Sequence, residues 1–278
     1  MSILFTQSVI LGDEETYPLT HTKIGFHTVT RDGTLTASSE TSTNPAYAAG
    51  LPNTYEYWIP TSVPAWIQVD AGEAIECDYF GIASHTIGSD GAALTLQYSN
   101  DGATWTDITN ASFTTDTPII IYFTAVTARY WRLYITGSAP RIGVWYVGKA
   151  LTMQRPIYGG HSPVTMSRKT VVRSNRSEGG QFLGRYIVRS GVATKFSYKN
   201  LDAGWIRSHF DKFILSARQY PYFIAWRPID FPREVAYGWT TRDISPSNMG
   251  IGQLMDVSFD IQGIGDYEGS DIDLYPGG

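Results

Sequence analysis

Short runs in which apolar and polar residues alternate recur along the first half of the chain. Trp66–Asp70 and Ala93–Tyr98 alternate as half-buried strands do, and Pro118–Phe123 and Arg129–Ile135 are two further strands. Ser99–Gly102 contains the Asp-Gly pair that favours a hairpin between strands. Helical spacing is absent from this half. Many short strands with regular turns predict an all-β sandwich.

The second half adds one helix to further strands. Asp202 suits the N-cap of this helix, and Pro221 ends it. Its apolar face repeats at helical spacing through Ile206, Phe210, Phe213, Ile214 and Ala217. A cleanly alternating strand, 254–261, follows near the end of the chain. This pattern predicts a β-sandwich or split barrel flanked by one helix.

The composition changes near Gly148, and the chain is expected to be mainly β with two folded domains. With 278 residues it is long enough for both. We predict an N-terminal extension (1–33), a β-sandwich (34–148), a second β domain (149–265) with its helix at 203–219, and a loose acidic tail (266–278).

The charge of the two halves differs in sign. Residues 1–150 hold 6 Lys and Arg against 14 Asp and Glu, whereas residues 151–278 hold 15 against 12. Neither half is basic enough to indicate nucleic-acid binding alone. A basic run in the second half gives the candidate subunit contacts: Arg168, Lys169, Arg173, Arg176, Arg185 and Arg189. We favour contact with an acidic neighbouring subunit, and DNA contact or solvated strand faces are the alternatives.

The residues that carry chemistry form no recognisable catalytic or metal pattern. Cys77 is the only cysteine, the five histidines lack metal-ligand spacing, and the acids show no pairing typical of a glycosidase. We therefore predict no enzyme activity, no metal site and no cofactor. Oxygens near Asn44, Asp70 or Asp101 could contribute to a structural calcium site, but their spacing gives no support for one. No apolar stretch approaches a membrane span, and a signal peptide is not evident at the N-terminus.

An ordered set of landmarks resembles the discoidin-like, or coagulation-factor type C, family over about residues 34–148. The landmarks are Thr36–Glu40, Trp58, Trp66–Gly72, Leu96–Trp105 and Val126–Ile135. The resemblance implies an eight-stranded jelly-roll sandwich with Trp58 in its core. It also implies loops at one end that often bind sugars, and a structural calcium is common in the family.

Three side chains are candidates for sugar binding. Tyr55 and Tyr57 lie in a Pro-flanked loop, where aromatic rings can stack on the apolar face of a sugar. His85 follows an apolar run and could hydrogen-bond a sugar at the sandwich end. The alternative for His85 is a structural loop histidine whose hydrogen bonds are satisfied within the protein.

Several segments also resemble tail proteins of long-tailed bacteriophages. They are 45–49, 54–58, 81–89, 220–228 and 235–239. This resemblance implies a structural protein of the virion, in the tail tip or baseplate. Copies would form a ring around the tail axis, assembled in the host cytoplasm, with other tail proteins and host surface glycans as partners. The protein would contact DNA only if DNA passes through the lumen of the ring. A carbohydrate-binding adhesin and the targeting module of a cell-wall or capsule hydrolase are the two alternatives.

Overall fold

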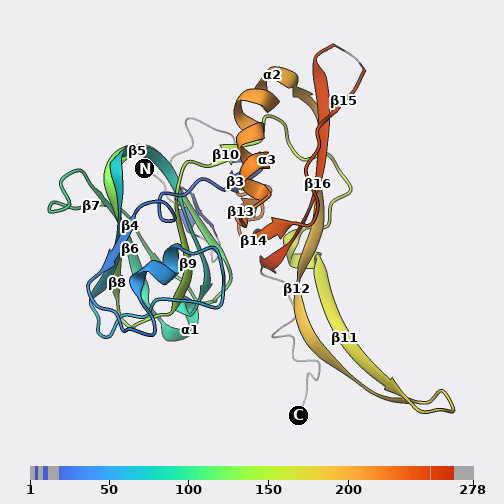
Figure 1. The fold of residues 1–278 in the computed structure, drawn as a ribbon, viewed down its shortest axis with the longest axis horizontal. Helices are drawn as coiled ribbons and strands as arrows, with labels where there is room; N and C mark the ends of the chain where they lie inside the picture. Colours follow the sequence, from blue (N-terminus) through green and yellow to red (C-terminus); the bar gives the residue numbers. More distant parts are fainter. Residues whose placement is uncertain (1–3, 6–8, 12–18, 251, 266–278) are drawn as a thin grey trace.

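The computed structural model describes residues 4–5, 9–11, 19–250 and 252–265. Two sheets of eight strands each dominate these residues. In Figure 1 the first sheet curls into a sandwich on one side of the molecule, and the second sheet lies on the other side with the helix against it. The predicted mainly-β fold, with a discoidin-like sandwich before a second β unit with one main helix, is confirmed.

The first sheet is built around two long antiparallel strands, β5 and β8, which pair with each other along most of their length. Its strands are β1 (Leu4–Phe5), β2 (Val9–Leu11), β4 (Thr34–Ala37), β5 (Ala65–His85), β6 (Ala93–Ser99), β7 (Thr106–Ser112), β8 (Ile119–Thr136) and β9 (Ile142–Gly148). β4 and β9 flank β5, β6 flanks β8, and the β6–β7 hairpin forms as the Asp-Gly turn predicts. Pairing is antiparallel throughout, except between β2 and β8.

Both long strands bend, which lets a single sheet close over a core. The register of β5 against β8 shifts between Asp70 and Ile75. At this point Gly72 has φ +81°, a conformation that costs glycine little, and its N–H donates to Asp70 Oδ1 at 2.8 Å. The runs predicted as separate strands at 118–123 and 129–135 are therefore two parts of β8.

Aromatic side chains fill the sandwich core. Trp58, Phe80, Trp131 and Trp145 are fully buried, and the Phe80 ring lies against both Trp131 and Trp145. Trp58 thus has the core position that the family resemblance implies. The strand pattern gave no sign of the short helices in this half, which are α1 (Ile87–Asp90) and the 3-10 turn η1 (Ala46–Gly50). Each is only about one turn long, too short for an apolar repeat to develop.

The second sheet gathers strands from both ends of the chain. In order across the sheet they are β10 (Leu151–Thr152), β3 (Lys23–Gly25), β13 (Tyr222–Ala225), β14 (Val235–Thr240), β16 (Leu254–Gly265), β12 (Phe182–Asp202) and β11 (Arg168–Arg176), with β15 (Ser247–Asn248) beside β16 and a 3-10 turn, η2 (Val164–Met166), before β11. β3 comes from the segment predicted as the N-terminal extension, and it pairs with β13.

The helix begins and packs as its sequence predicts. The Asp202 side chain caps it by accepting from Trp205 N at 2.8 Å. It continues through α2 (Ala203–Trp205), a π-helical turn (Ile206–Phe210) and α3 (Asp211–Ala217). Its buried face packs on the sheet, with the Phe213 ring 4.8 Å from that of Tyr222. Compared with the predicted 203–219, the helix is two residues shorter at its C-terminal end.

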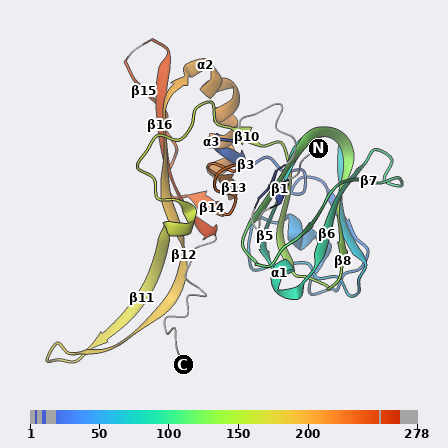
Figure 2. The same cartoon turned by 180° about the vertical axis from the view of Figure 1, so that it is seen from behind.

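The two units share an apolar interface. The Tyr146 ring on β9 packs edge-on against Phe223 and Tyr237 of the second sheet, at centroid distances of 5.4 and 5.9 Å. Gly81 on β5 makes room for Phe223, because a Cβ there would lie 2.6 Å from its ring. Figure 2 shows the same side-by-side arrangement from behind.

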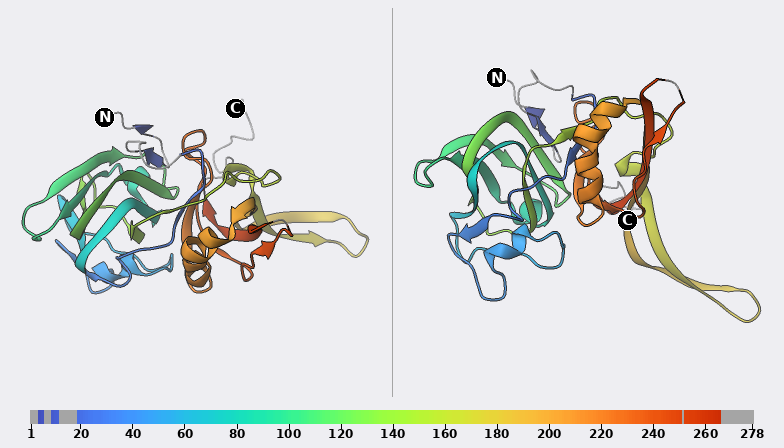
Figure 3. Two further views of the ribbon diagram at one scale, coloured as in Figure 1. Left: turned by 90° about the horizontal axis from the view of Figure 1, so that it is seen from above. Right: turned by 45° about the horizontal axis from the view of Figure 1, so that its top comes forward.

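A long hairpin, formed by β11 and the first half of β12, extends beyond the second sheet. Residues 182–191 of β12 pair with β11, and from Val192 onward β12 also pairs with β16. The views of Figure 3 and Figure 1 agree that the hairpin points away from the sandwich.

Candidate functional site

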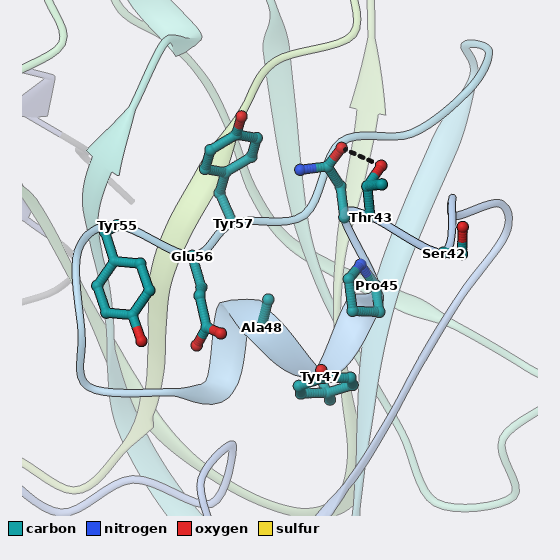
Figure 4. A pocket seen from close by; sticks show the side chains of 9 residues that line it. Ser42, Thr43, Pro45, Tyr47, Ala48, Tyr55, Glu56 and Tyr57 are labelled. Carbon is teal, nitrogen blue, oxygen red and sulfur yellow. Dashed lines mark hydrogen bonds between the residues drawn. The ribbon is translucent and has the colours of Figure 1, made fainter.

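A surface hollow of about 250 Å³ lies at the loop end of the sandwich, between β4 and β5. It is lined by Ser42, Thr43, Asn44, Pro45, Tyr47, Ala48, Tyr55, Glu56 and Tyr57. In Figure 4 the Tyr55 and Glu56 side chains point to one side of their segment and the Tyr57 ring points to the other, while Tyr47 lies near Pro45 and Ala48. Tyr55 is 75% exposed and Tyr47 is 60% exposed, whereas Tyr57 is half-buried.

The loop that carries these residues is tied to the sandwich at both of its ends. Trp58 and Ile142 exchange backbone hydrogen bonds of 2.9 and 3.0 Å, and Trp58 Nε1 donates to Ser39 O at 2.9 Å. Glu40 Oε2 accepts from Ala46 N at 2.6 Å, directly after Pro45 has set an extended backbone before η1. A buried tryptophan and a short helical turn therefore hold the tyrosines on a fixed base.

Polar groups around the hollow are oriented by their neighbours. Glu56 Oε2 accepts from Asn53 Nδ2 at 2.8 Å, while Glu56 N donates to Asn53 Oδ1 at 3.0 Å. On the other side, the Thr43 hydroxyl donates to Asn44 Oδ1 at 3.1 Å, which fixes the orientation of the Asn44 amide. The Arg141 guanidinium lies 5.1 Å from the centre of the Tyr57 ring, within cation–π range. The hollow thus combines apolar ring faces with fixed carboxylate and amide groups.

The structure brings together two of the three predicted sugar-binding residues, Tyr55 and Tyr57. Tyr47 and Glu56 are not among the residues predicted to bind sugar, and Asn44 is predicted only as a possible oxygen donor to calcium, without support from its spacing. Tyr47 follows Pro45 by two residues, and an aromatic residue shortly after a proline in a predicted loop is a signal that could have identified it.

His85, the third residue predicted to bind sugar, is not among the residues that line the hollow. It is 2% exposed, its Nε2 lies 2.8 Å from Thr117 O, and its Nδ1 accepts from Ile87 N at 3.2 Å. Both ring nitrogens are thus engaged within the sandwich. Burial lowers the pKa of His85 to about 4, so the ring is neutral at pH 7. This geometry agrees with the alternative interpretation of a structural histidine.

The basic residues predicted as subunit contacts lie on the projecting hairpin, far along the chain from the hollow. Arg168, Lys169, Arg173, Arg176, Arg185 and Arg189 are all exposed there. Their role in subunit contact stays a prediction.

All three oxygen donors named for calcium are engaged in local contacts, Asn44 through its bond from Thr43. Asp70 forms a bidentate ion pair with Arg129, with both N–O distances 2.7 Å, and this pair lowers the pKa of its carboxyl. Asp101 Oδ1 accepts from the backbone N–H groups of Ala103 and Thr104, which lowers the pKa of Asp101. Within the described ranges, no group of three His, Cys, Asp or Glu side chains could hold a metal ion. The absence of a cofactor stays a prediction.

The helices of the described residues are also too short or too polar to cross a membrane.

Several solved structures are similar to part of this chain. One is a Clostridium perfringens protein in complex with GalNAc-β-1,3-galactose, with 17% identity and a TM-score of 0.40, covering 44% of this chain and 99% of the other. Another is chitosan-binding module 2 of a chitosanase/glucanase from Paenibacillus sp. IK-5 in complex with chitotriose, with 20% identity, a TM-score of 0.38 and coverage of 43% and 98%. A third is a pectin-binding carbohydrate-binding module, with 20% identity, a TM-score of 0.37 and coverage of 41% and 88%.

Among curated protein sequences, none matches this chain. The comparison with protein families matches residues 34–147 to the F5/8 type C domain. This range agrees closely with the span of the landmarks and contains all residues that line the hollow. Residues 34–147, which are less than half of the chain, are therefore similar to the F5/8 type C, or discoidin-like, domain.

Proposed function

We propose that the hollow formed by Tyr47, Tyr55 and Tyr57 binds a carbohydrate. The observation that supports this most strongly is the cluster of three tyrosines around a hollow with a fixed carboxylate and amide, in the loops of an F5/8 type C domain. Glycan binding was the first alternative from the sequence, and the site geometry favours it over the other functions. The hollow is slightly smaller than pockets for drug-sized ligands, roughly 300–1,000 Å³, and suits one sugar unit.

Each lining group has a distinct part in this binding mode. The exposed rings of Tyr47 and Tyr55 offer flat apolar faces for the C–H groups of a sugar ring, and their hydroxyls can exchange hydrogen bonds with sugar hydroxyls. Glu56, already fixed by Asn53, accepts from a sugar hydroxyl, and the Asn44 amide donates to one. The pair of aromatic faces supplies affinity, and the two polar groups select the arrangement of hydroxyls.

A glycan array probed with the full chain tests this proposal. We expect signals for a subset of glycans, and we expect Tyr55→Ala and Tyr47→Ala each to weaken them roughly tenfold or more, because each loses a contact worth about 1.4 kcal/mol or more. Tyr158→Ala is the matched control, since Tyr158 is an exposed tyrosine in the second unit. Signals unchanged in the Tyr55 and Tyr47 variants, or no bound glycan at all, would contradict the proposal.

A structural role in the tail tip of a tailed phage is the second candidate. The projecting β11–β12 hairpin favours it, because this arm gives the chain a surface for contacts outside its own core. In that role the sandwich would face host glycans while the second unit contacts other subunits. Electron microscopy of virions labelled with an antibody to this chain tests the role: label at the tail tip supports it, and unlabelled virions contradict it. If the chain is instead the targeting module of a hydrolase, it is also expected to bind a glycan. The lack of enzyme activity in this chain stays a prediction.

A further inference from the structure

The β11–β12 hairpin has a surface that the other described residues leave uncovered. Among the described strands, residues 182–191 of β12 pair only with β11, and β11 pairs only with β12. Between its turn and Val192 the ribbon therefore has two strands and two open edges. A two-stranded ribbon alone is marginally stable in water, and open edges invite pairing or packing with another chain.

Large apolar side chains are exposed along the β12 side of this ribbon. They are Phe182, Leu183, Tyr186, Ile187 and Val188, and we call them the apolar strip. Phe182 is 66% exposed and Ile187 is 65% exposed, although Ile187 is paired with Val172 across the ribbon. Exposed apolar residues scattered singly are normal, but five within seven residues of one strand are typical of an interaction surface.

The turn at the end of the hairpin is polar, which favours a protein partner over a lipid membrane. Ser177 N donates to Gln181 O at 2.9 Å, and Gln181 N donates to Ser177 Oγ at 3.0 Å. Glu178 is exposed in this turn. A hairpin that inserts its end into lipid would need apolar side chains at the turn, whereas here they follow it along the stem. Packing along the side of the stem suits the surface of a protein.

Charge complementarity indicates that the partner of the hairpin is a second copy of the chain. Residues 168–191 contain six Arg and Lys and one acid, Glu178, so the hairpin has a charge of +5. Two hairpins would repel each other. Residues 34–147 contain ten Asp and Glu and three Arg, a charge of −7, and the hairpin points away from the sandwich of its own chain. It can therefore reach an acidic sandwich only on another copy.

We propose that the β11–β12 hairpin is a head-to-tail assembly arm, whose apolar strip and basic residues bind the discoidin-like domain of a second copy. The contact joins two different surfaces, so repetition produces a closed ring or an open chain of subunits. This inference is independent of carbohydrate binding and applies to either candidate function.

Sedimentation equilibrium of the full chain at several concentrations tests the arm. We expect the wild type to associate, and the double variant Phe182→Ser/Ile187→Ser to weaken association roughly tenfold or more, as loss of apolar interface anchors does. Leu215→Ser is the matched control, because Leu215 is an exposed apolar residue on α3. All three side chains are exposed, so the circular dichroism spectra should remain those of the wild type.

A mixing experiment distinguishes a head-to-tail contact from hairpin-to-hairpin pairing. The double variant lacks a working arm but keeps its acceptor sandwich, so added to the wild type it should cap growing assemblies and lower their mean mass. A wild type that stays monomeric at every concentration, or a double variant that associates like the wild type, would overturn the proposal. Binding of the wild type to phosphatidylserine vesicles that the double variant loses would overturn it as well.

Discussion

At the scale of single residues, His85 shows how burial changes the role of a side chain. Its two ring nitrogens bind Thr117 O and Ile87 N, so the ring fastens α1 and the loop before β8 to the end of β5. The sequence could identify the histidine after an apolar run, but the residues that enclose it come from a loop 32 positions further along the chain. Its role could therefore not be predicted from local pattern.

The lowered pKa of His85 predicts a loss of stability in acid. Above pH 6.5 the ring is neutral in both the folded and unfolded chains, so the free energy of unfolding is not affected. As pH falls from 6.5 to about 4, the unfolded chain binds a proton that the folded chain excludes, and stability is lost. At 1.36 kcal/mol per pKa unit, the loss is on the order of 3 kcal/mol.

Urea unfolding of the wild type and His85→Gln at pH 7 and pH 4 measures this loss. The variant has no proton to bind at this position, so its free energy of unfolding should fall less over the same range. The comparison also removes the contribution of Asp78, whose pKa burial raises to about 6 and which acts in the opposite direction. Equal pH dependence in the two proteins would show that His85 is not held neutral.

Among the secondary structure elements, the sequence predicted the helix best. Its N-cap, its buried face and its stop before Pro221 depend on contacts within about a turn, which a linear pattern contains. The continuity of β5 and β8 could not be predicted in the same way. In the sequence, the residues around Gly72 resemble an ordinary turn between two strands. The segments before and after Gly72 form one strand only because both pair with β8, at Asp70–Tyr130 and at Ile75–Ala128.

The cap of the helix gives a prediction at this scale. Asp202→Ala removes the acceptor for Trp205 N, and we expect it to lower the free energy of unfolding by about 1 kcal/mol. Asp202→Asn keeps an oxygen acceptor at the same place and should lose only a fraction of that. Thermal and urea unfolding measure both variants. An alanine variant as stable as the asparagine variant would show that the cap contributes nothing.

For the whole molecule, the interface between the two units determines how the parts cooperate. Tyr79, Tyr146 and Phe223 alternate with core residues along their strands, and nothing in the local sequence indicates that the second face of each strand is also covered. Tyr237 also donates a 2.7 Å hydrogen bond to Pro52 O, in the loop that carries the hollow. The second unit therefore supports the candidate binding loop directly.

Gly81 is the sharpest test of this interface. A methyl group at Gly81 would meet the Phe223 ring at 2.6 Å, so Gly81→Ala should lower the free energy of unfolding by about 1–3 kcal/mol. Gly159→Ala is the control, because nothing lies within 4 Å of the place its methyl group would take and its φ is not in the left-handed region. Calorimetry should show a lower transition temperature for the first variant alone. Equal transitions would mean that the two units do not pack as described.

An NMR titration of the full chain with a glycan selected from the array tests the central claim most directly. If the hollow binds the sugar, amide resonances should shift with saturation in the loop 42–57, most strongly around Tyr47, Tyr55 and Glu56, and the hairpin and helix should be unaffected. Saturable shifts confined to the second unit, with the 42–57 loop unchanged, would contradict the account.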